Sequence, residues 1–375
     1  MVSIARASLV YEWRRYLAAL LSVTFAGLLV VVQAGLLHGL FRSVSLPVDR
    51  SSAQLWVTFP NLLSVDHARP VSSHADALAR MNPAIERVER YSVTGGDMRR
   101  PDGVAVSIIV HAIDTRPDAM AFSGMLTLAQ RSRLDEPDAL IVDRADLGKF
   151  GVDVGGLVEV NGKRARVVEA IDGLRSVGGV AAIASFETGR RFDESLRRDE
   201  PHYVLLGLLP QADIQRVAQE IADTVSPPRY SVSVAPEFSR RSQLYWLLES
   251  GVGIGAGFAA LLALMVGVVI ASQTLSAAIL ASLKEFATLR ALGVSPGQLR
   301  AVVFELAAWI GVVGLVLTGL LTVLVAAVAK AHHIAMAFSG WLVAGTAVSI
   351  LLITALSGLY ALRPLFRAEP ANLLR

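Results

Sequence analysis

Apolar residues are concentrated toward the two ends of the chain, whereas the middle has the mixed composition of a globular domain. An uncharged run covers residues 16–41, and three further apolar stretches fall within residues 246–275, 301–329 and 339–362. A helix needs about 20 predominantly apolar residues to cross the hydrocarbon core of a bilayer. Each stretch meets that length, so the pattern predicts four transmembrane helices.

The polar middle, residues 42–245, shows the periodicities of both strands and helices. The predicted strands cover residues 54–59, 87–93 and 104–113, and the predicted helices cover residues 73–81, 143–150 and 210–224. Asn161-Gly162 lies between residues 157–160 and 164–171, which have strand character, and this dipeptide is typical of a two-residue β-hairpin turn. We therefore expect a membrane protein of four transmembrane α-helices, with a large α+β domain of one or two lobes inserted between helices 1 and 2.

Positive charge predicts the orientation of these helices. Arginine and lysine are frequent in the N-terminus (residues 1–15), in the loop of residues 276–300 and in the tail of residues 363–375. The loop of residues 330–338 has one lysine and two histidines. Because positive residues are enriched on the cytoplasmic side, we expect both termini and the 276–300 loop to be cytoplasmic and the 42–245 domain to be extracytoplasmic.

The first apolar run has a second interpretation, a cleaved signal peptide. Such a peptide has an apolar core of about 7–15 residues followed by a cleavage site of small residues. Residues 16–41 form a longer run, and no such site ends it cleanly. We therefore expect a retained membrane anchor.

Composition supports a membrane location, argues against nucleic-acid binding and excludes sites that need cysteine. Charged residues make up 18% of the chain, whereas soluble proteins have about 25%. The net charge of +3 is small and forms no basic face, which argues against nucleic-acid binding. The chain has no cysteine, which excludes disulfides, thiolate metal sites and cysteine nucleophiles.

Motifs of two common kinds of site are absent from the sequence. It contains no phosphate-binding G-x-x-x-x-G-K-[ST] motif and no metal-binding H-E-x-x-H motif. The letters GVSPG at 293–297 match G-x-S-x-G, but we interpret these residues as a helix stop and a helix cap. The glycine pairs at 95–96, 155–156 and 178–179 lack the strand–turn–helix context of a dinucleotide site, and we interpret them as turns. We therefore expect no catalytic residue, no metal site and no ATP binding by this chain alone.

The loop between the second and third predicted spans has a distinctive local pattern. Leu280, Leu283 and Phe286 recur near helical spacing, which gives one apolar face beside charged residues. Gly293 is a stop signal, and residues 295–298 (Ser-Pro-Gly-Gln) are typical of an N-cap, a first-turn proline and a capping-box glutamine. The loop is therefore predicted to be a helix, a tight corner and the start of a second helix.

Two segments resemble a known family. Residues 284–295, KEFATLRALGVS, resemble the RE-x-G-x-LRALG-A-S signature of the FtsX-like permease family, with Lys284 in place of the usual arginine. The ending RPLFRAEPANLLR resembles the terminal A-x-x-x-DPAEALR, with Asn372 in place of glutamate. The order of one span, a large domain and three spans also matches, and AQLWV at 53–57 is similar to the DevC and HrtB branch.

This resemblance implies a role and partners. Members are permease subunits of ABC transporters of the MacB and LolCDE type, in the inner membrane of bacteria. The resemblance therefore implies two copies of a separate ATPase that binds ATP and Mg²⁺. It also implies a second permease copy in a homodimer and, in some branches, a periplasmic adaptor (membrane fusion) protein. The resemblance also places a coupling helix in the 276–300 loop, and its candidate ATPase contacts are Leu283, Lys284, Glu285, Phe286, Leu289, Arg290, Leu292 and Gly293. The alternative is an amphipathic helix in the lipid interface.

Function then divides into two hypotheses. The first is ATP-driven export of a hydrophobic or amphiphilic cargo (haem, a glycolipid or a drug) by mechanotransmission, with His38 and Glu249 as candidate cargo contacts near span ends. Their plainer interpretation is that both are solvated at the headgroups. The second hypothesis is a regulator similar to FtsX, which activates a cell-wall hydrolase through its external domain and transports nothing.

Overall fold

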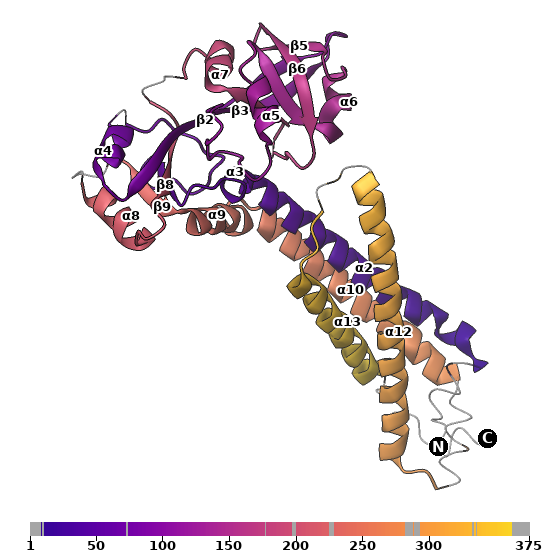
Figure 1. Cartoon of the computed structure of the whole chain (residues 1–375). Coiled ribbons are helices and arrows are strands. Elements are labelled where there is room, and N and C mark those ends of the chain that lie inside the picture. The colour runs from indigo at the N-terminus through magenta and orange to yellow at the C-terminus, as the bar shows by residue number, and fades with distance from the viewer. Residues whose placement is uncertain are drawn as a thin grey trace. The chain divides into compact units, whose positions relative to one another are not determined.

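A computed structural model of the chain describes residues 9, 11–72, 74–176, 178–196, 200–224, 229–281, 288, 293–331, 334 and 336–361. The chain divides into two compact units (Figure 1). The membrane unit consists of Met1–Gly39 and Val252–Arg375, and the sheet unit consists of Leu40–Gly251. The polar middle of the sequence therefore folds as one separate body.

The described part of the membrane unit contains four helices that are long and apolar enough to cross a bilayer. They are α2 (Trp13–Val44), α10 (Val252–Ala281), α12 (Pro296–Ala331) and α13 (Gly340–Ala361). Large apolar side chains on them are exposed, including Phe258 at 61% and Leu320 at 64%. Exposed apolar surface of this extent is typical of contact with lipid or another chain, and the chain is a membrane protein.

Small residues bring the membrane helices close together. A Cβ atom at Gly27 would lie 2.6 Å from Cδ1 of Ile350 and 2.9 Å from Oγ1 of Thr318, so glycine is needed there. The Thr318 hydroxyl donates a buried hydrogen bond of 3.2 Å to the carbonyl oxygen of Thr24. Close backbone approach and hydroxyl hydrogen bonds are the usual means by which helices associate in lipid.

In the described part of the sheet unit, nine strands form one mixed sheet in the order β3-β7-β4-β6-β5-β2-β8-β1-β9, and β2 also pairs with β3. The β3–β7 and β4–β6 pairs are parallel, and the other pairs are antiparallel. The strands are β1 (Leu55–Thr58), β2 (Ile85–Arg99), β3 (Ala105–Ile113), β4 (Ala139–Asp143), β5 (Leu157–Val160), β6 (Lys163–Ile171), β7 (Val180–Ser185), β8 (Tyr203–Leu208) and β9 (Ser231–Val234).

Short helices cover this sheet, so the insert is an α+β domain as predicted. They are α3 (Leu46–Asp49), α4 (Ala75–Met81), α5 (Leu128–Arg133), α6 (Leu147–Phe150), α7 (Phe186–Phe192), α8 (Ile214–Asp223) and α9 (Ala235–Leu244), with a 3₁₀ turn at Arg144–Asp146 and a π-helical segment at Tyr245–Glu249. Figure 1 shows α4 and α8 beside β8 and β9, and α5, α6 and α7 around β3, β5 and β6.

The long strand β2 joins these two halves. Its first part pairs with β8 as far as Tyr91, and its second part pairs with β3 from Ser92 onward. An aromatic cluster packs at this change of partner, where the Trp56 ring lies 5.6 Å from both Tyr91 and Tyr203 and 5.9 Å from Phe238. Aromatic pairs at such separations add to the free energy gained from burying their area.

Several local predictions are confirmed. Strands occur at β1, β2 and β3, helices occur at α4 and α8, and residues 143–150 contain a 3₁₀ turn followed by α6. Asn161 and Gly162 have φ angles of 48° and 75° and connect β5 to β6, with Val160 paired to Lys163. Two successive positive φ angles are the signature of the type I′ hairpin turn.

The prediction of a turn at Gly95-Gly96 is wrong. Both residues lie inside β2, where Gly95 pairs with Ile109 and Gly96 with Ile108. Glycine is needed at position 96 because a Cβ atom there would lie 2.0 Å from Oδ1 of Asn161. The glycine therefore marks a close approach of two segments and not a change of chain direction.

A break precedes the second membrane helix. The π-helical segment Tyr245–Glu249 ends at Ser250, and Gly251 has a φ of 79°, in the left-handed region. Helix α10 then begins at Val252, whereas the sequence pattern predicts a span over 246–275. Glycine adopts a positive φ at little cost, so it can separate two helical segments that a hydropathy pattern cannot tell apart.

Candidate functional site

The 276–300 loop carries the predicted contacts to an ATPase. Of these eight contacts the structure describes only Gly293, whose φ of 93° is left-handed. The others lie outside the described residues, and they are Leu283, Lys284, Glu285, Phe286, Leu289, Arg290 and Leu292. No heavy atom lies within 4 Å of a Cβ placed on Gly293, so the backbone conformation, and not lack of space, favours glycine there.

The start of α12 fixes the end of this loop. The Ser295 backbone N–H donates to Oε1 of Gln298 at 3.0 Å, and the Gln298 backbone N–H donates to Oγ of Ser295 at 3.3 Å. Pro296 is the first residue of α12. This reciprocal pair is the predicted capping box, and it makes the turn after Gly293 a defined corner.

The two candidate cargo contacts lie in different units. His38 is half-buried in α2, and its ring lies 6.0 Å from the Trp341 ring in an edge-on arrangement. Glu249 is exposed at the end of the π-helical segment of the sheet unit. A cargo role for either residue stays a prediction.

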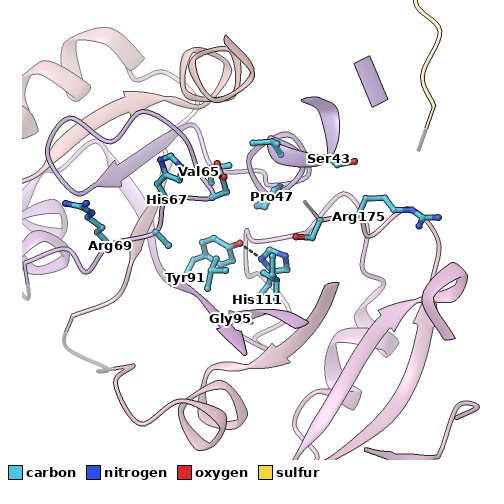
Figure 2. Close-up of a pocket in the computed structure, with 15 residues that line it drawn as sticks. Ser43, Pro47, Val65, His67, Arg69, Tyr91, Gly95, His111 and Arg175 are labelled. Atoms are coloured by element: carbon cyan, nitrogen blue, oxygen red, sulfur yellow. Dashed lines mark hydrogen bonds and ion pairs between the residues drawn. The ribbon is translucent and has the colours of Figure 1, made fainter. Parts of the chain in front are cut away.

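A cavity in the sheet unit is a further candidate that the sequence did not indicate. It has a volume of about 590 Å³, within the range of pockets that hold small ligands (Figure 2). We call it the β2–β3 pocket. Its lining residues are Ser43, Val44, Pro47, Val65, Asp66, His67, Ala68, Arg69, Tyr91, Val93, Gly95, Ile109, His111, Arg175 and Ser176.

Strand register builds the floor of this pocket. Side chains alternate along a strand, so Tyr91, Val93 and Gly95 share one face of β2. Val93 pairs with His111 and Gly95 pairs with Ile109, which brings the lining residues of β3 onto the same face. The floor therefore extends across the point where β2 changes partner from β8 to β3.

A buried hydrogen bond joins two floor residues. The Tyr91 hydroxyl lies 2.7 Å from Nδ1 of His111, and both side chains are buried (Figure 2). Burial lowers the pKa of His111 to about 4. Burial, and then the neighbouring Tyr203, raise the pKa of Tyr91 well above its usual value. Both groups are therefore uncharged near neutral pH.

Residues 65–67 form one wall of the pocket, and side chains from later in the chain fix its position. The Trp246 indole N–H lies 3.2 Å from both carboxylate oxygens of Asp66, and the Tyr203 hydroxyl donates to the Val65 carbonyl oxygen at 2.6 Å. The rings of His67 and Tyr245 are 4.8 Å apart. Because this wall is fixed by side chains from distant segments, the pocket is largely preformed.

Two arginines line the edge of the pocket. Arg175 lies 3.6 Å from Oδ1 of Asp143 and 3.9 Å from Oδ1 of Asp146, distances that correspond to loose ion pairs. Arg69 stacks over the Phe59 ring, with its guanidinium carbon 5.5 Å from the ring centroid. Burial raises the pKa of Asp143, which the charge of Arg175 partly opposes.

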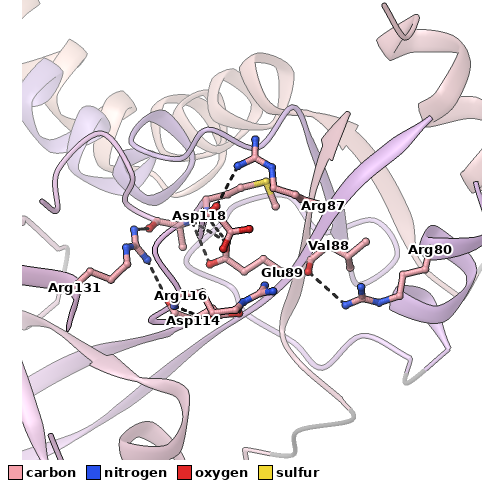
Figure 3. A network of polar contacts seen from close by, with 10 residues as sticks. Arg80, Arg87, Val88, Glu89, Asp114, Arg116, Asp118 and Arg131 are labelled. Atoms are coloured by element: carbon pink, nitrogen blue, oxygen red, sulfur yellow. Dashed lines mark hydrogen bonds and ion pairs between the residues drawn. The ribbon is translucent and has the colours of Figure 1, made fainter. Parts of the chain in front are cut away.

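A second polar cluster surrounds Glu89 on β2 (Figure 3). Glu89 is 2% exposed and accepts hydrogen bonds from the backbone N–H groups of Met120 and Ala121. Arg131 is equally buried and donates to the carbonyl oxygens of Asp114 at 2.8 Å and Ala121 at 2.6 Å. This cluster fastens the segment between β3 and α5 to the sheet.

The pKa of Glu89 is perturbed. Burial is the main cause that raises it from 4.5 to about 7. The two backbone hydrogen bonds and the charge of Arg131 act in the opposite direction, and the charge of Asp114 adds to the rise. Glu89 therefore changes protonation near neutral pH, although no sequence motif marks it.

Comparison with known proteins finds a family match in the C-terminal third of the chain. Residues 257–370 match the family described as FtsX-like permease C-terminal. No curated protein matches the chain at a significant level.

Two solved structures are similar to part of the chain. The periplasmic region of MacB from Actinobacillus actinomycetemcomitans is 8% identical, with a TM-score of 0.38, and covers 51% of this chain and 92% of that chain. The extracellular domain of the noncanonic ABC-type transporter YknZ from Gram-positive bacteria is 11% identical, with a TM-score of 0.35, and covers 48% of this chain and 99% of that chain.

Proposed function

Because residues 257–370 belong to the FtsX-like permease C-terminal family, we propose that this chain is a membrane subunit of an ABC transporter. The family match is the observation that carries the proposal. The four apolar helices and the large domain between the first and second of them support it. In this role the chain moves or presents a hydrophobic or amphiphilic cargo, and a partner supplies the energy.

The energy comes from a separate ATPase in this proposal. The sequence has no phosphate-binding G-x-x-x-x-G-K-[ST] loop. Two ATPase copies would bind two copies of this permease through the segment between α10 and α12. In that segment Leu283, Phe286 and Leu289 offer apolar contacts, while Lys284 and Arg290 offer charge.

The corner at the end of the segment suits force transmission. The left-handed Gly293 and the Ser295–Gln298 capping box connect the segment to α12 without a long flexible linker. A shift imposed on the segment would therefore reach α12 as a movement of the helix. Residues 250–283 contain no charged side chain, which agrees with mechanotransmission because polar transport pathways through a membrane usually contain ionisable residues.

Orientation follows from charge in this proposal. The positively charged 1–15, 276–300 and 363–375 segments are cytoplasmic, and the sheet unit lies outside the cytoplasm of a bacterium. An adaptor protein is a candidate partner of the sheet unit there. Since the chain has no cysteine, a Ser132→Cys variant gives a single labelling site on exposed α5. An impermeant maleimide should label it from outside intact cells, and labelling only after lysis would contradict this orientation.

Association with the ATPase tests the coupling segment. We expect Leu289→Asp to abolish co-purification with the ATPase and to leave membrane insertion intact, because a carboxylate cannot be buried in an apolar contact without a large cost. Thr288→Asp is the matched control, because helical spacing places residue 288 away from the face of Leu283 and Phe286. If the Leu289→Asp variant bound the ATPase as well as the control did, the coupling role of this segment would be wrong.

A second assay separates export from regulation. ATPase turnover of the purified complex should rise when the true cargo is added, if the chain exports that cargo. Turnover that no amphiphile changes, together with activation of a cell-wall hydrolase by the sheet unit, would instead favour the regulatory alternative.

A further inference from the structure

We propose that the β2–β3 pocket of the sheet unit binds a small amphiphile that carries a carboxylate. The apolar body packs on Val44, Val65 and Ile109, and the carboxylate accepts a hydrogen bond from Nε2 of His111. The proposal concerns binding by this chain and does not rest on the proposed transport function.

The first argument is the chemistry of the cavity surface. Val44, Pro47, Val65, Val93 and Ile109 present aliphatic surface to a volume of about 590 Å³. Polar side chains share the lining, with Tyr91 and His111 on the floor and Arg69 and Arg175 at the edge. Aliphatic surface together with convergent polar groups is the usual form of a small-molecule site.

The second argument is an unpartnered donor on the floor. A phenol O–H is a better donor than an imidazole N–H, and an imidazole nitrogen is a better acceptor than a phenol oxygen. Tyr91 therefore donates to Nδ1 of His111, and the ring proton of the neutral histidine lies on Nε2. His111 is 5% exposed and lines the pocket, and its Nε2 makes no hydrogen bond to the part of the chain that the structure describes.

An acceptor on the ligand satisfies this donor. A ligand oxygen within hydrogen-bonding reach of Nε2 supplies the acceptor that the described part of the chain does not. Figure 2 shows the Tyr91–His111 pair at the centre of the lining residues, with Pro47 and Val65 across from it. The pair thus supplies a fixed donor opposite an apolar wall.

The third argument is the charge at the edge. Arg69 and Arg175 line the pocket, and the carboxylate that lines it with them is Asp66. Their two positive charges exceed the one negative charge of Asp66, although Arg175 is also loosely paired with Asp143 and Asp146. Arg69, which stacks on the Phe59 ring, is therefore the cation that favours a carboxylate over an ammonium group.

Gly95 keeps the floor open. The nearest heavy atom to a Cβ placed on Gly95 is the Ile108 carbonyl oxygen, at 4.0 Å. A larger side chain at this position would therefore fit the backbone and occupy the cavity beside Ile109. This provides a variant that fills the site and leaves the Tyr91–His111 pair in place.

The test uses a cysteine reporter in the full chain, held in nanodiscs. Ser176→Cys places a thiol of nearly the same size as serine in the lining, and Ser132→Cys places one on exposed α5 as the control. Decanoate is the probe, and decyltrimethylammonium, which has the same tail and no acceptor, is its matched control. Saturating decanoate should slow maleimide labelling of Ser176→Cys about tenfold, since 90% occupancy leaves a tenth of the sites open.

Two variants in the Ser176→Cys background complete the test. Gly95→Leu should abolish protection by decanoate, while Gly148→Leu, at an exposed glycine with no heavy atom within 4 Å, should keep it. His111→Phe should weaken decanoate binding at least about fivefold, because an aromatic ring remains at position 111 and the N–H donor is lost.

Three results would each overturn the proposal. The first is equal protection of Ser176→Cys by the two amphiphiles, and the second is protection by decanoate that survives both Gly95→Leu and His111→Phe. The third is a labelling rate of Ser176→Cys that decanoate does not slow.

Discussion

Replacing Glu89 by glutamine should remove a pH dependence from the stability of the sheet unit. The folded unit holds the carboxyl proton up to about pH 7, whereas the unfolded chain releases it near pH 4.5. Between these values the folded state binds more protons, so the free energy of unfolding falls as pH rises. This contribution is fully present below about pH 4.5 and lost above about pH 7.

The magnitude follows from the two pKa values. Their difference corresponds to about 3 kcal/mol. Glutamine has nearly the same shape, and its amide oxygen can accept the same backbone hydrogen bonds from Met120 and Ala121. We therefore expect Glu89→Gln to gain about 3 kcal/mol relative to the native chain between pH 4.5 and pH 8.

His111 contributes in the opposite sense. Its pKa falls from 6.5 to about 4 on burial, so the unfolded chain binds a proton that the folded unit excludes over that interval. The resulting stability is present above pH 6.5 and is lost as pH falls toward 4. The two contributions oppose each other between about pH 4.5 and 6.5. Glu89→Gln should therefore show a rise in stability over this range that the native chain lacks.

Hydrogen–deuterium exchange of the intact chain in nanodiscs can measure this effect. Protection of amides in β1, β2 and β8, corrected for the intrinsic exchange rate at each pH, reports the opening free energy of the domain. The other titratable groups are present in both the variant and the native chain. The difference between their opening free energies at each pH therefore reports the titration of Glu89 alone. A difference that stays constant from pH 4.5 to 8 would refute the reasoning.

Three further substitutions test the local structure. Gly162→Val should destabilise the sheet unit by about 1–2 kcal/mol, because the φ of 75° is strained for a β-branched residue; urea unfolding measures this, with Gly148→Val as the control. Ser295→Ala should cost about 1 kcal/mol and increase amide exchange in the first turn of α12 alone, whereas Ser295→Asp should preserve the cap. Trp56→Ala should cost about 3–5 kcal/mol in urea unfolding, because Trp56 is completely buried among aromatic rings, and an unchanged midpoint would contradict the packing described.

Features that depend on neighbouring residues could be predicted from the sequence. The turn at Asn161-Gly162 and the capping box at Ser295–Gln298 each rest on side chains within four positions, and both are present. The four apolar helices could be predicted because lipid requires long apolar stretches. The resemblance at residues 284–295 and the family match at 257–370 agree on the same membrane part.

Features that depend on register could not be predicted. The strands β4 and β7 are short apolar runs whose pairing brings residues 141 and 183 together, which periodicity alone does not specify. The β2–β3 pocket likewise exists because Val93 pairs with His111 and because the distant Asp66 meets Trp246. The alternation of Tyr91, Val93 and Gly95 was the available signal, and it was ambiguous because Gly95-Gly96 resembled a turn.

The sheet order has a consequence for biogenesis. The first strand, β1, has both of its neighbours far along the chain, because Leu55 pairs with Leu206 of β8 and with Val234 of β9. A ribosome must therefore complete nearly the whole insert before the most N-terminal strand finds either partner. Until then its apolar edge is open to aggregation, and assembly of this half should be slow. Nascent copies would depend on chaperone protection during that interval.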